Sequence, residues 1–165
     1  MPNIEIKARA NNLASLEIVA KKLATTHLGL DHQIDTYFQT KEGRFKLRES
    51  TLKGAYLIPY LRPDVSGPKK SDYAMIPVDD GQKIKELFSK ILGPLKVIKK
   101  TRDIYLINNI RVHLDNVENL GTFLEFEAVY ENPQDEASER SKVHDLLNQF
   151  GIKESDLITH SYSDF

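Results

Sequence analysis

Polar and apolar residues alternate along much of this chain, most clearly in IRVHLDNVENLGTFLEFEAVY at residues 110–130. Successive side chains of a β-strand point to opposite faces, so this stretch predicts two strands that each have one apolar and one polar face. A polar face can meet bulk water or line an enclosed site. Here it is ionic and carries both signs of charge: Arg111, His113, Asp115, Glu125 and Glu127.

The same alternation predicts eight strands in all, and apolar residues at helical spacing predict three helices. The strands are expected at residues 3–9, 33–40, 44–50, 55–62, 71–78, 97–108, 110–117 and 122–130. The helices are expected at 12–28, at 79–93 with a buried stripe of Ile84, Leu87, Phe88 and Ile91, and from Pro133, capped by Asn132, to Gly151. Short connections favour antiparallel neighbours, so the expected fold is α+β: a single domain over residues 1–165, with an eight-stranded antiparallel β-barrel and helices packed on its outside.

The predicted order of elements repeats. Both halves run strand, helix, strand, strand, strand, and IDTYF in the first half resembles RDIYL in the second, as FKLRE resembles VHLDN. We therefore expect two similar halves that together close one sheet. Pro59 is expected at an edge or a bulge, because proline cannot donate to a strand ladder.

The ionic faces of these strands are expected to point into the barrel. For any one strand, a charged face turned to solvent is the commoner arrangement. Three helices need apolar surface to pack against, however, so the apolar faces must lie outside and the ionic faces inside. The residues on these inward faces are Glu5, Lys7, Arg9, Asp35, Tyr37, Lys46, Arg48, Tyr60, Arg62, Lys100, Arg102, Arg111, His113, Asp115, Glu125 and Glu127.

A charged interior indicates a bound ligand, because ionic groups removed from bulk water must be paired or liganded. Basic residues outnumber acidic ones on the inward faces, which suits a polyanion: Arg and Lys together bind phosphate oxygens. The acidic minority suits Mg²⁺ or Mn²⁺, which take carboxylate oxygens alongside substrate phosphates. The pattern therefore predicts an enclosed site for a metal-bound polyphosphate.

Composition narrows the class of protein. The chain has 165 residues, 28% of them charged, and a net charge of −1, so no overall basic field favours nucleic acid. It has no cysteine, which excludes disulfides, zinc–thiolate sites and cysteine nucleophiles. No signal peptide or membrane-spanning run is recognisable, so we expect a cytoplasmic protein without membrane contact. Either a monomer or a homodimer is compatible with the pattern.

The ordered motifs IEIKAR, QIDTYF, RFKLRE, YLRPD, KSDY, KKTRDIY, RVHLDNVENLG and FLEFE resemble the CYTH, or triphosphate tunnel metalloenzyme, superfamily. The resemblance is to its class IV adenylate cyclase-like (CyaB-like) branch and runs from residue 3 to the final SYSDF. It implies an eight-stranded tunnel that binds a triphosphate-bearing small molecule together with Mg²⁺ or Mn²⁺.

The resemblance also implies roles for individual residues. Triphosphate-binding residues would be Lys7, Lys46, Arg48, Arg62, Lys100, Arg102 and Arg111. Metal ligands would be Glu5, Asp115, Glu125 and Glu127, and the catalytic set would be Glu5, Lys7 and Glu127. One position departs from the family pattern: Asn3 stands where the first glutamate of the signature belongs, so one catalytic cation is expected and a second is in doubt.

Three functions follow from this reading. The leading one is a metal-dependent phosphohydrolase acting on inorganic triphosphate or on an organic (nucleoside or thiamine) triphosphate. The second is an adenylate cyclase, which converts ATP to cyclic AMP and pyrophosphate and needs an adenine pocket in addition. The third, motivated by Asn3, is a protein that binds polyphosphate or nucleotide without catalysis.

Overall fold

The computed structural model describes residues 2–165, and its main elements are nine strands and three helices. The strands are β1 (Pro2–Arg9), β2 (Thr26–Phe38), β3 (Arg44–Ser50), β4 (Gly54–Leu61), β5 (Lys69–Tyr73), β6 (Ile76–Val78), β7 (Pro94–Ile107), β8 (Ile110–Val117) and β9 (Gly121–Val129). The helices are α1 (Leu13–Leu23), α2 (Gly81–Leu92) and α3 (Glu136–Gln149). Short 3₁₀ turns are η1 (Pro133–Asp135), η2 (Glu154–Asp156) and η3 (Tyr162–Asp164).

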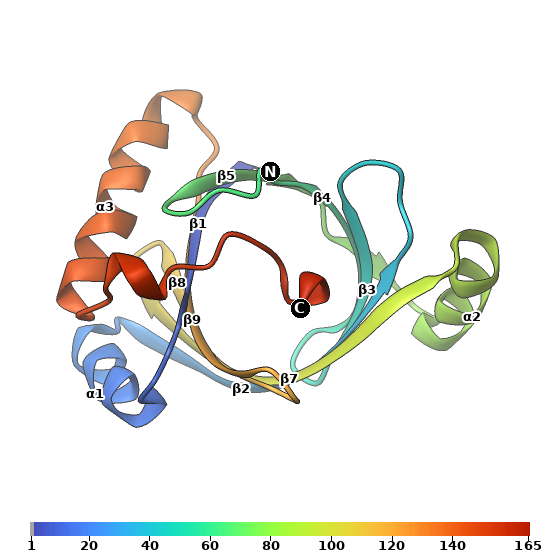
Figure 1. Ribbon diagram of the computed structural model, residues 1–165, viewed down its shortest axis with the longest axis horizontal. Coiled ribbons are helices and arrows are strands. Elements are labelled where there is room, and N and C mark those ends of the chain that lie inside the picture. Colours follow the sequence, from blue (N-terminus) through green and yellow to red (C-terminus); the bar gives the residue numbers. More distant parts are fainter. Residues whose placement is uncertain (1) are drawn as a thin grey trace.

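Eight of the strands close into an antiparallel barrel, as the sequence predicts (Figure 1). Their order is β3-β2-β7-β8-β9-β1-β5-β4, and β4 pairs back with β3. The expected strand at residues 71–78 is divided, because β5 ends at Tyr73 and β6 pairs separately with the first half of β4. Pro59 lies between the stretches of β4 that pair with β6 and with β5, where its missing donor costs no ladder bond.

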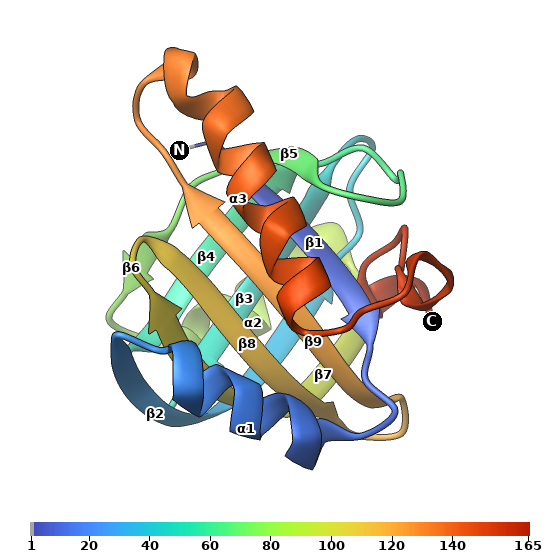
Figure 2. The same cartoon turned by 90° about the vertical axis from the view of Figure 1, so that its left-hand side faces the viewer.

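The apolar faces of the strands lie outside the barrel, where two helices cover them. Figure 2 shows α3 packed across β1 and β9, with α1 beside it near the ends of β2 and β8. The core between helices and sheet contains β-strand residues such as Ile6, Val112 and Phe126, and helical residues such as Ala20 and Val143. The predicted inversion, with apolar residues outside and ionic residues inside, is therefore confirmed.

Helix α2 differs from the prediction, because none of its residues is buried. It lies at the opposite side of the barrel from α1 and α3 (Figure 1). Of its expected apolar stripe, Leu87 is 42% exposed and Ile91 is 70% exposed. Phe88 packs against the rings of Phe38 and Phe45, which attaches the helix to β2 and β3.

The first helix is also shorter than predicted. It begins after Asn12, whose side chain accepts a hydrogen bond from the Ser15 amide, and ends at Leu23 rather than at residue 28. From Thr26 onward the chain instead pairs with β7. Thr25 and Thr26 are β-branched and fit a strand better than a helix, so long-range pairing prevails over the weak helical spacing of this segment.

The repeat of element order is observed, but one of its proposed sequence matches is out of step. Aligning IDTYF with RDIYL equates Asp35 with Asp103. Asp35 faces the barrel interior, whereas Asp103 faces outward and accepts hydrogen bonds from Tyr105 and His27. A shift of one residue moves a side chain to the opposite face, so this match fails by one position. The match of FKLRE with VHLDN keeps the faces, because Lys46 and His113 both line the interior.

The C-terminal segment crosses one opening of the barrel (Figure 1). It forms the two turns η2 and η3. Tyr162 is buried and packs against Phe123, and the buried ammonium of Lys69 donates to the carbonyls of Thr159, Ile158 and Val65. This end of the barrel is therefore closed by the chain itself.

None of the helices formed by residues 2–165 has the length and apolar character needed to span a membrane.

We predict that Phe126→Ala lowers the free energy of unfolding by about 3–5 kcal/mol. Phe126 has no exposed surface, and its ring lies 5.0 Å from that of Phe150 at the C-terminal cap of α3, so truncation opens a cavity between sheet and helix. Urea denaturation measures the change. The matched control is Ile18→Ala on α1. Ile18 is 70% exposed, so truncating its side chain should change the free energy of unfolding by less than about 0.5 kcal/mol. Equal losses in the two variants would contradict this core.

Candidate active site

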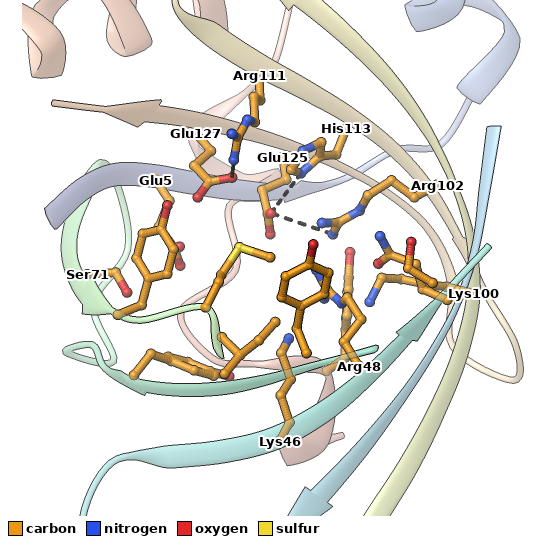
Figure 3. Close-up of a pocket in the computed structure, with 18 of the residues that line it drawn as sticks. Glu5, Lys46, Arg48, Ser71, Lys100, Arg102, Arg111, His113, Glu125 and Glu127 are labelled. Carbon is orange, nitrogen blue, oxygen red and sulfur yellow. Dashed lines mark hydrogen bonds and ion pairs between the residues drawn. The ribbon is translucent and has the colours of Figure 1, made fainter. Parts of the chain in front are cut away.

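A cavity inside the barrel brings together ten of the eleven residues predicted for the site (Figure 3). Its wall contains eight basic residues and four acidic ones, so the excess of positive charge expected from the alternation is present. The ten predicted residues that line it are Glu5, Lys7, Lys46, Arg48, Arg62, Lys100, Arg102, Arg111, Glu125 and Glu127. Asp115, which was expected among the metal ligands, does not line the cavity.

Asp115 lies behind the wall, where its carboxylate is fully engaged. Arg102 donates to both oxygens through Nε and Nη2, each at 2.7 Å, and the hydroxyl of Tyr162 donates to Oδ2 at 2.7 Å. The residue has no exposed surface. Burial alone would raise the pKa of Asp115, but the charge of Arg102 lowers it to about 2. In this arrangement Asp115 orients Arg102 and offers no free oxygen to a cation.

A second buried carboxylate, Asp35, is surrounded by basic residues in the same way as Asp115. It lies on β2, and its oxygens accept hydrogen bonds from Arg48 Nε and Nη2 at 2.7 Å each, from Lys46 Nζ at 2.9 Å and from Lys100 Nζ at 2.9 Å. Burial would raise the pKa of this carboxyl, but the charges of Arg48, Lys100 and Lys46 hold it well below its usual range. Three cations on the cavity wall thus share one carboxylate.

The charge of these cations depends on their surroundings. Burial, followed by the charge of Arg48, lowers the pKa of Lys46 to about 8. Burial also lowers the pKa of Lys100 well below its usual value, and the charge of Asp35 opposes that change. The charge of both lysines is therefore sensitive to pH and to any anion placed against them.

Glu125 connects β1, β8 and β9 across the wall. It contacts Lys7 Nζ at 2.9 Å, His113 Nδ1 at 3.0 Å and Arg102 Nη2 at 3.5 Å. Burial would raise the pKa of Glu125, but Lys7 and Arg102 keep it well below its usual range. Burial, together with the charge of Arg102, lowers the pKa of His113, which favours the neutral ring expected of a lining hydrogen-bond partner.

Glu5 and Glu127 face one another across the β1–β9 pairing, where they are direct register partners. Glu5 is paired with Arg62, and Glu127 accepts a hydrogen bond from the Asn3 amide at 2.6 Å, with Arg111 3.8 Å away. The side-chain oxygen of Asn3 is buried and has no hydrogen-bond partner among residues 2–165.

These oxygens fit a hard divalent cation by chemical type. Mg²⁺ and Mn²⁺ take ligands of the types offered here: the carboxylates of Glu5 and Glu127, the amide oxygen of Asn3 and, two register positions further along the same strands, the carboxylate of Glu125. Within the described part of the chain, no three acidic or histidine side chains already converge on one point. Each carboxylate is instead held by a basic or amide group, which a bound cation would have to replace.

The sequence reasoning missed several residues of this site. The even spacing of the inward face of β2 could have identified Asp31 and Gln33, which line the cavity; Asp31 also anchors the β3–β4 turn through Ser50, Thr51 and the Leu52 amide. Ser161 and Tyr162 had no such signal, because the C-terminal segment has no periodic pattern. Ser161 accepts a hydrogen bond from Arg62, and the ring of Tyr162 lies 3.8 Å from Lys7 Nζ.

The cavity wall contains apolar as well as polar side chains. Tyr162 and Ser161 of the C-terminal segment contribute to its wall beside the basic residues. Leu28, Ile104 and Met75 also line it, and Leu28 and Met75 are 43% and 37% exposed. The arrangement can hold a chain of phosphoryl groups among the cations and leaves an apolar surface for an organic substituent.

Comparison with known proteins identifies the family of this chain. Residues 1–162 match the family model described as the CYTH domain. A protein of Methanocaldococcus jannaschii named "Putative adenylate cyclase MJ0240" is 24% identical over 169 residues, which cover 98% of this chain and 97% of that protein.

Solved structures resemble the whole chain. The PH1012 protein from Pyrococcus horikoshii OT3 is 25% identical, with a TM-score of 0.82 and 98% of each chain covered. HpAC1 from Hippeastrum carries an adenylyl cyclase name and is described as having a dominant triphosphatase activity. It is 18% identical, with a TM-score of 0.63, and the match covers 96% of this chain and 91% of that one; this likeness concerns the fold.

We predict that Asp115→Asn lowers the free energy of unfolding by about 3–5 kcal/mol, because it leaves the buried Arg102 without its counter-charge. Isothermal titration calorimetry measures the Mn²⁺ affinity of each variant. Asp115→Asn should change this affinity far less than Glu127→Gln, which removes a charged oxygen from the cavity wall. The reverse ranking of the two variants would restore Asp115 as a metal ligand.

We also predict that affinity for tripolyphosphate falls as the pH rises through about 8, since Lys46 then loses the proton that makes it a cation. Calorimetry in buffer containing a chelator measures this without metal. The control is Lys46→Arg, whose side chain stays protonated over this pH range. Tripolyphosphate itself titrates in the same way in both measurements, so the difference between the two profiles reports on Lys46. Identical profiles for the wild type and this variant would show that Lys46 does not contribute its charge.

Proposed function

Because the chain belongs to the CYTH domain family, we propose that it is a metal-dependent triphosphatase that hydrolyses inorganic triphosphate or an organic triphosphate. The family includes triphosphatases and proteins named as adenylate cyclases; its members bind triphosphates, and its tunnel enzymes generally depend on a divalent metal. The observation that carries the proposal is the enclosed cavity, whose wall has eight basic residues against four acidic ones.

The basic residues would bind the phosphate chain. Arg48, Arg62 and Arg102 are held by Asp35, Glu5 and Asp115 respectively, so their planar heads are oriented before a substrate arrives. Lys7, Lys46, Lys100 and Arg111 add further positive charge along the same wall. Cations fixed in advance stabilise the charge that develops on a transferred phosphoryl group at little cost in reorganisation.

Glu5, Glu125 and Glu127, with the amide oxygen of Asn3, are the residues that would hold Mg²⁺ or Mn²⁺. When bound, such an ion polarises the phosphoryl group and neutralises its charge. Glu5 and Glu127 are the candidates for accepting a proton from the attacking water, because both are carboxylates on the cavity wall.

Adenylate cyclase is the second candidate. In that reaction the ribose 3′ hydroxyl attacks the α-phosphorus and pyrophosphate leaves. The apolar side chains of the cavity wall, Leu28, Met75 and Ile104, could contact the organic substituent of a triphosphate, and this observation favours the cyclase as second candidate. Hydrolysis needs only a water molecule in place of the held ribose, which favours the triphosphatase.

Phosphorus NMR tests the proposal directly. The protein is incubated with Mg²⁺ or Mn²⁺ and, separately, with tripolyphosphate and ATP. We expect orthophosphate from at least one of them. Pyrophosphate with cyclic AMP from ATP would establish the cyclase instead. Ligand binding without any product would favour the binding protein, and Asn3→Glu would then be expected to create turnover.

In the same assay, Glu127→Ala should lower the metal-dependent rate by about 100-fold or more, because it removes both a metal ligand and a candidate base. Its circular dichroism spectrum should match that of the wild type. The control is Glu131→Ala, an exposed carboxylate just beyond β9, which should keep the wild-type rate. A Glu127→Ala variant with wild-type kinetics would remove this residue from the site.

A further inference from the structure

Asp35 stands apart from the other acidic residues of the barrel interior because it pairs with three basic residues at once. Like Asp115, it is fully buried and absent from the cavity wall; it lies on β2. Its three partners, Lys46, Arg48 and Lys100, all line that wall (Figure 3). A ligand in the cavity would therefore contact the three cations and never the carboxylate that holds them.

Asp35 is also the sole ion-pair partner of these three cations within residues 2–165. Two of the cations come from β3 and one from β7, the strands on either side of β2. Within residues 2–165, Asp35 is the one carboxylate at ion-pair distance from any of the three. Lys100 and Asp35 have side-chain exposures of 1% and 0%, so this contact is shielded from bulk water.

We propose that Asp35 is the positioning residue of the polyanion site: from behind the cavity wall it holds the heads of Lys46, Arg48 and Lys100 together and keeps all three charged. The identity of the anion rests on the proposed function. The effect on the three cations does not, because it is a property of the free protein.

The electrostatic surroundings explain why one carboxylate has this effect. Lys46 is faced by Arg48 on its own strand, by Arg102 on β7, and by the rings of Tyr37 and Tyr60. Lys100 is faced by Arg48, Arg102 and Lys46, with the ring of Tyr162 at 5.5 Å. Asp115 also interacts electrostatically with Lys100, but both of its oxygens are engaged by Arg102. The other charged neighbours named here are cations. Without Asp35, burial and mutual repulsion would both favour loss of protons from the two lysines.

Asp31 provides a matched control on the same strand and the same face. It is also buried, with 1% of its surface exposed, but its partners are neutral: Gln33, Ser50, Thr51 and the Leu52 amide. Replacing it removes an equally buried carboxylate without touching the three cations. Any loss of stability common to Asp31→Asn and Asp35→Asn is therefore structural.

The first experiment follows the lysine ε-methylene NMR signals of the free protein against pH, with Lys46 and Lys100 assigned from their Lys→Arg variants. In Asp35→Asn we expect both titration midpoints to fall by about one pH unit or more. In Asp31→Asn they should stay at their wild-type values. Unchanged midpoints in Asp35→Asn would overturn the proposal.

The second experiment measures tripolyphosphate affinity against pH by calorimetry, with a chelator present. Relative to the wild type, Asp35→Asn should bind about tenfold more weakly at pH 8, while at pH 6, where Lys46 is again protonated, most of this deficit should disappear. A structural defect alone would weaken binding equally at both pH values, which would contradict the proposed role.

A second pair of variants keeps the test decisive if Asp35→Asn does not fold. Lys100→Met and the double variant Asp35→Asn/Lys100→Met differ only in the carboxylate of residue 35. The double variant leaves one buried cation fewer without a counter-charge than Asp35→Asn does, which favours folding. The Lys46 midpoint should be lower in the double variant, and equal midpoints would refute the proposal. If the midpoints move as expected but the wild type does not bind tripolyphosphate, the proposed function fails while the role of Asp35 stands.

Discussion

Buried ion pairs between carboxylates and basic residues are the interactions that the barrel interior depends on. Lys46, Arg48, Lys100 and Arg102 lie largely out of water, where an uncompensated charge would cost several kcal/mol. Asp35 and Asp115 offset that cost from behind the wall, each held by hydrogen bonds of 2.7–2.9 Å. Because these two carboxylates neutralise only part of the charge, the wall keeps the positive excess that a polyanion would neutralise.

Apart from Asp31, which lines the cavity and anchors the β3–β4 turn, the acidic residues of the interior are of two kinds. Asp35 and Asp115 face the basic residues and not the cavity, so they organise the wall. Glu5, Glu125 and Glu127 line the cavity on the neighbouring strands β1 and β9, and each is engaged by a group that a ligand could displace. The proposed chemistry belongs to the second kind, and its geometry depends on the first.

The scaffold explains how so polar an interior can exist. A small barrel is usually filled by apolar side chains, but here most apolar strand residues lie outside and are buried against α1 and α3. A smaller apolar cluster, with Tyr37, Phe123 and Tyr162, lies where the C-terminal segment closes the barrel. Closure of the sheet gives every barrel strand a paired neighbour on both sides. The hydrophobic driving force therefore acts on the outer surface of the sheet, and the interior remains available for charge.

The sequence by itself determined the strands, their faces and most of the cavity wall, because alternation with a period of two fixes which side chains share a face. It could not determine which inward carboxylates reach the cavity. Asp35 and Asp115 have the same pattern as Glu125 and Glu127, and only the neighbouring strands and Tyr162 decide that they are covered. The closing of one end by the C-terminal segment and the exposure of α2 were likewise decided by tertiary contacts, since both depend on surfaces distant in the sequence.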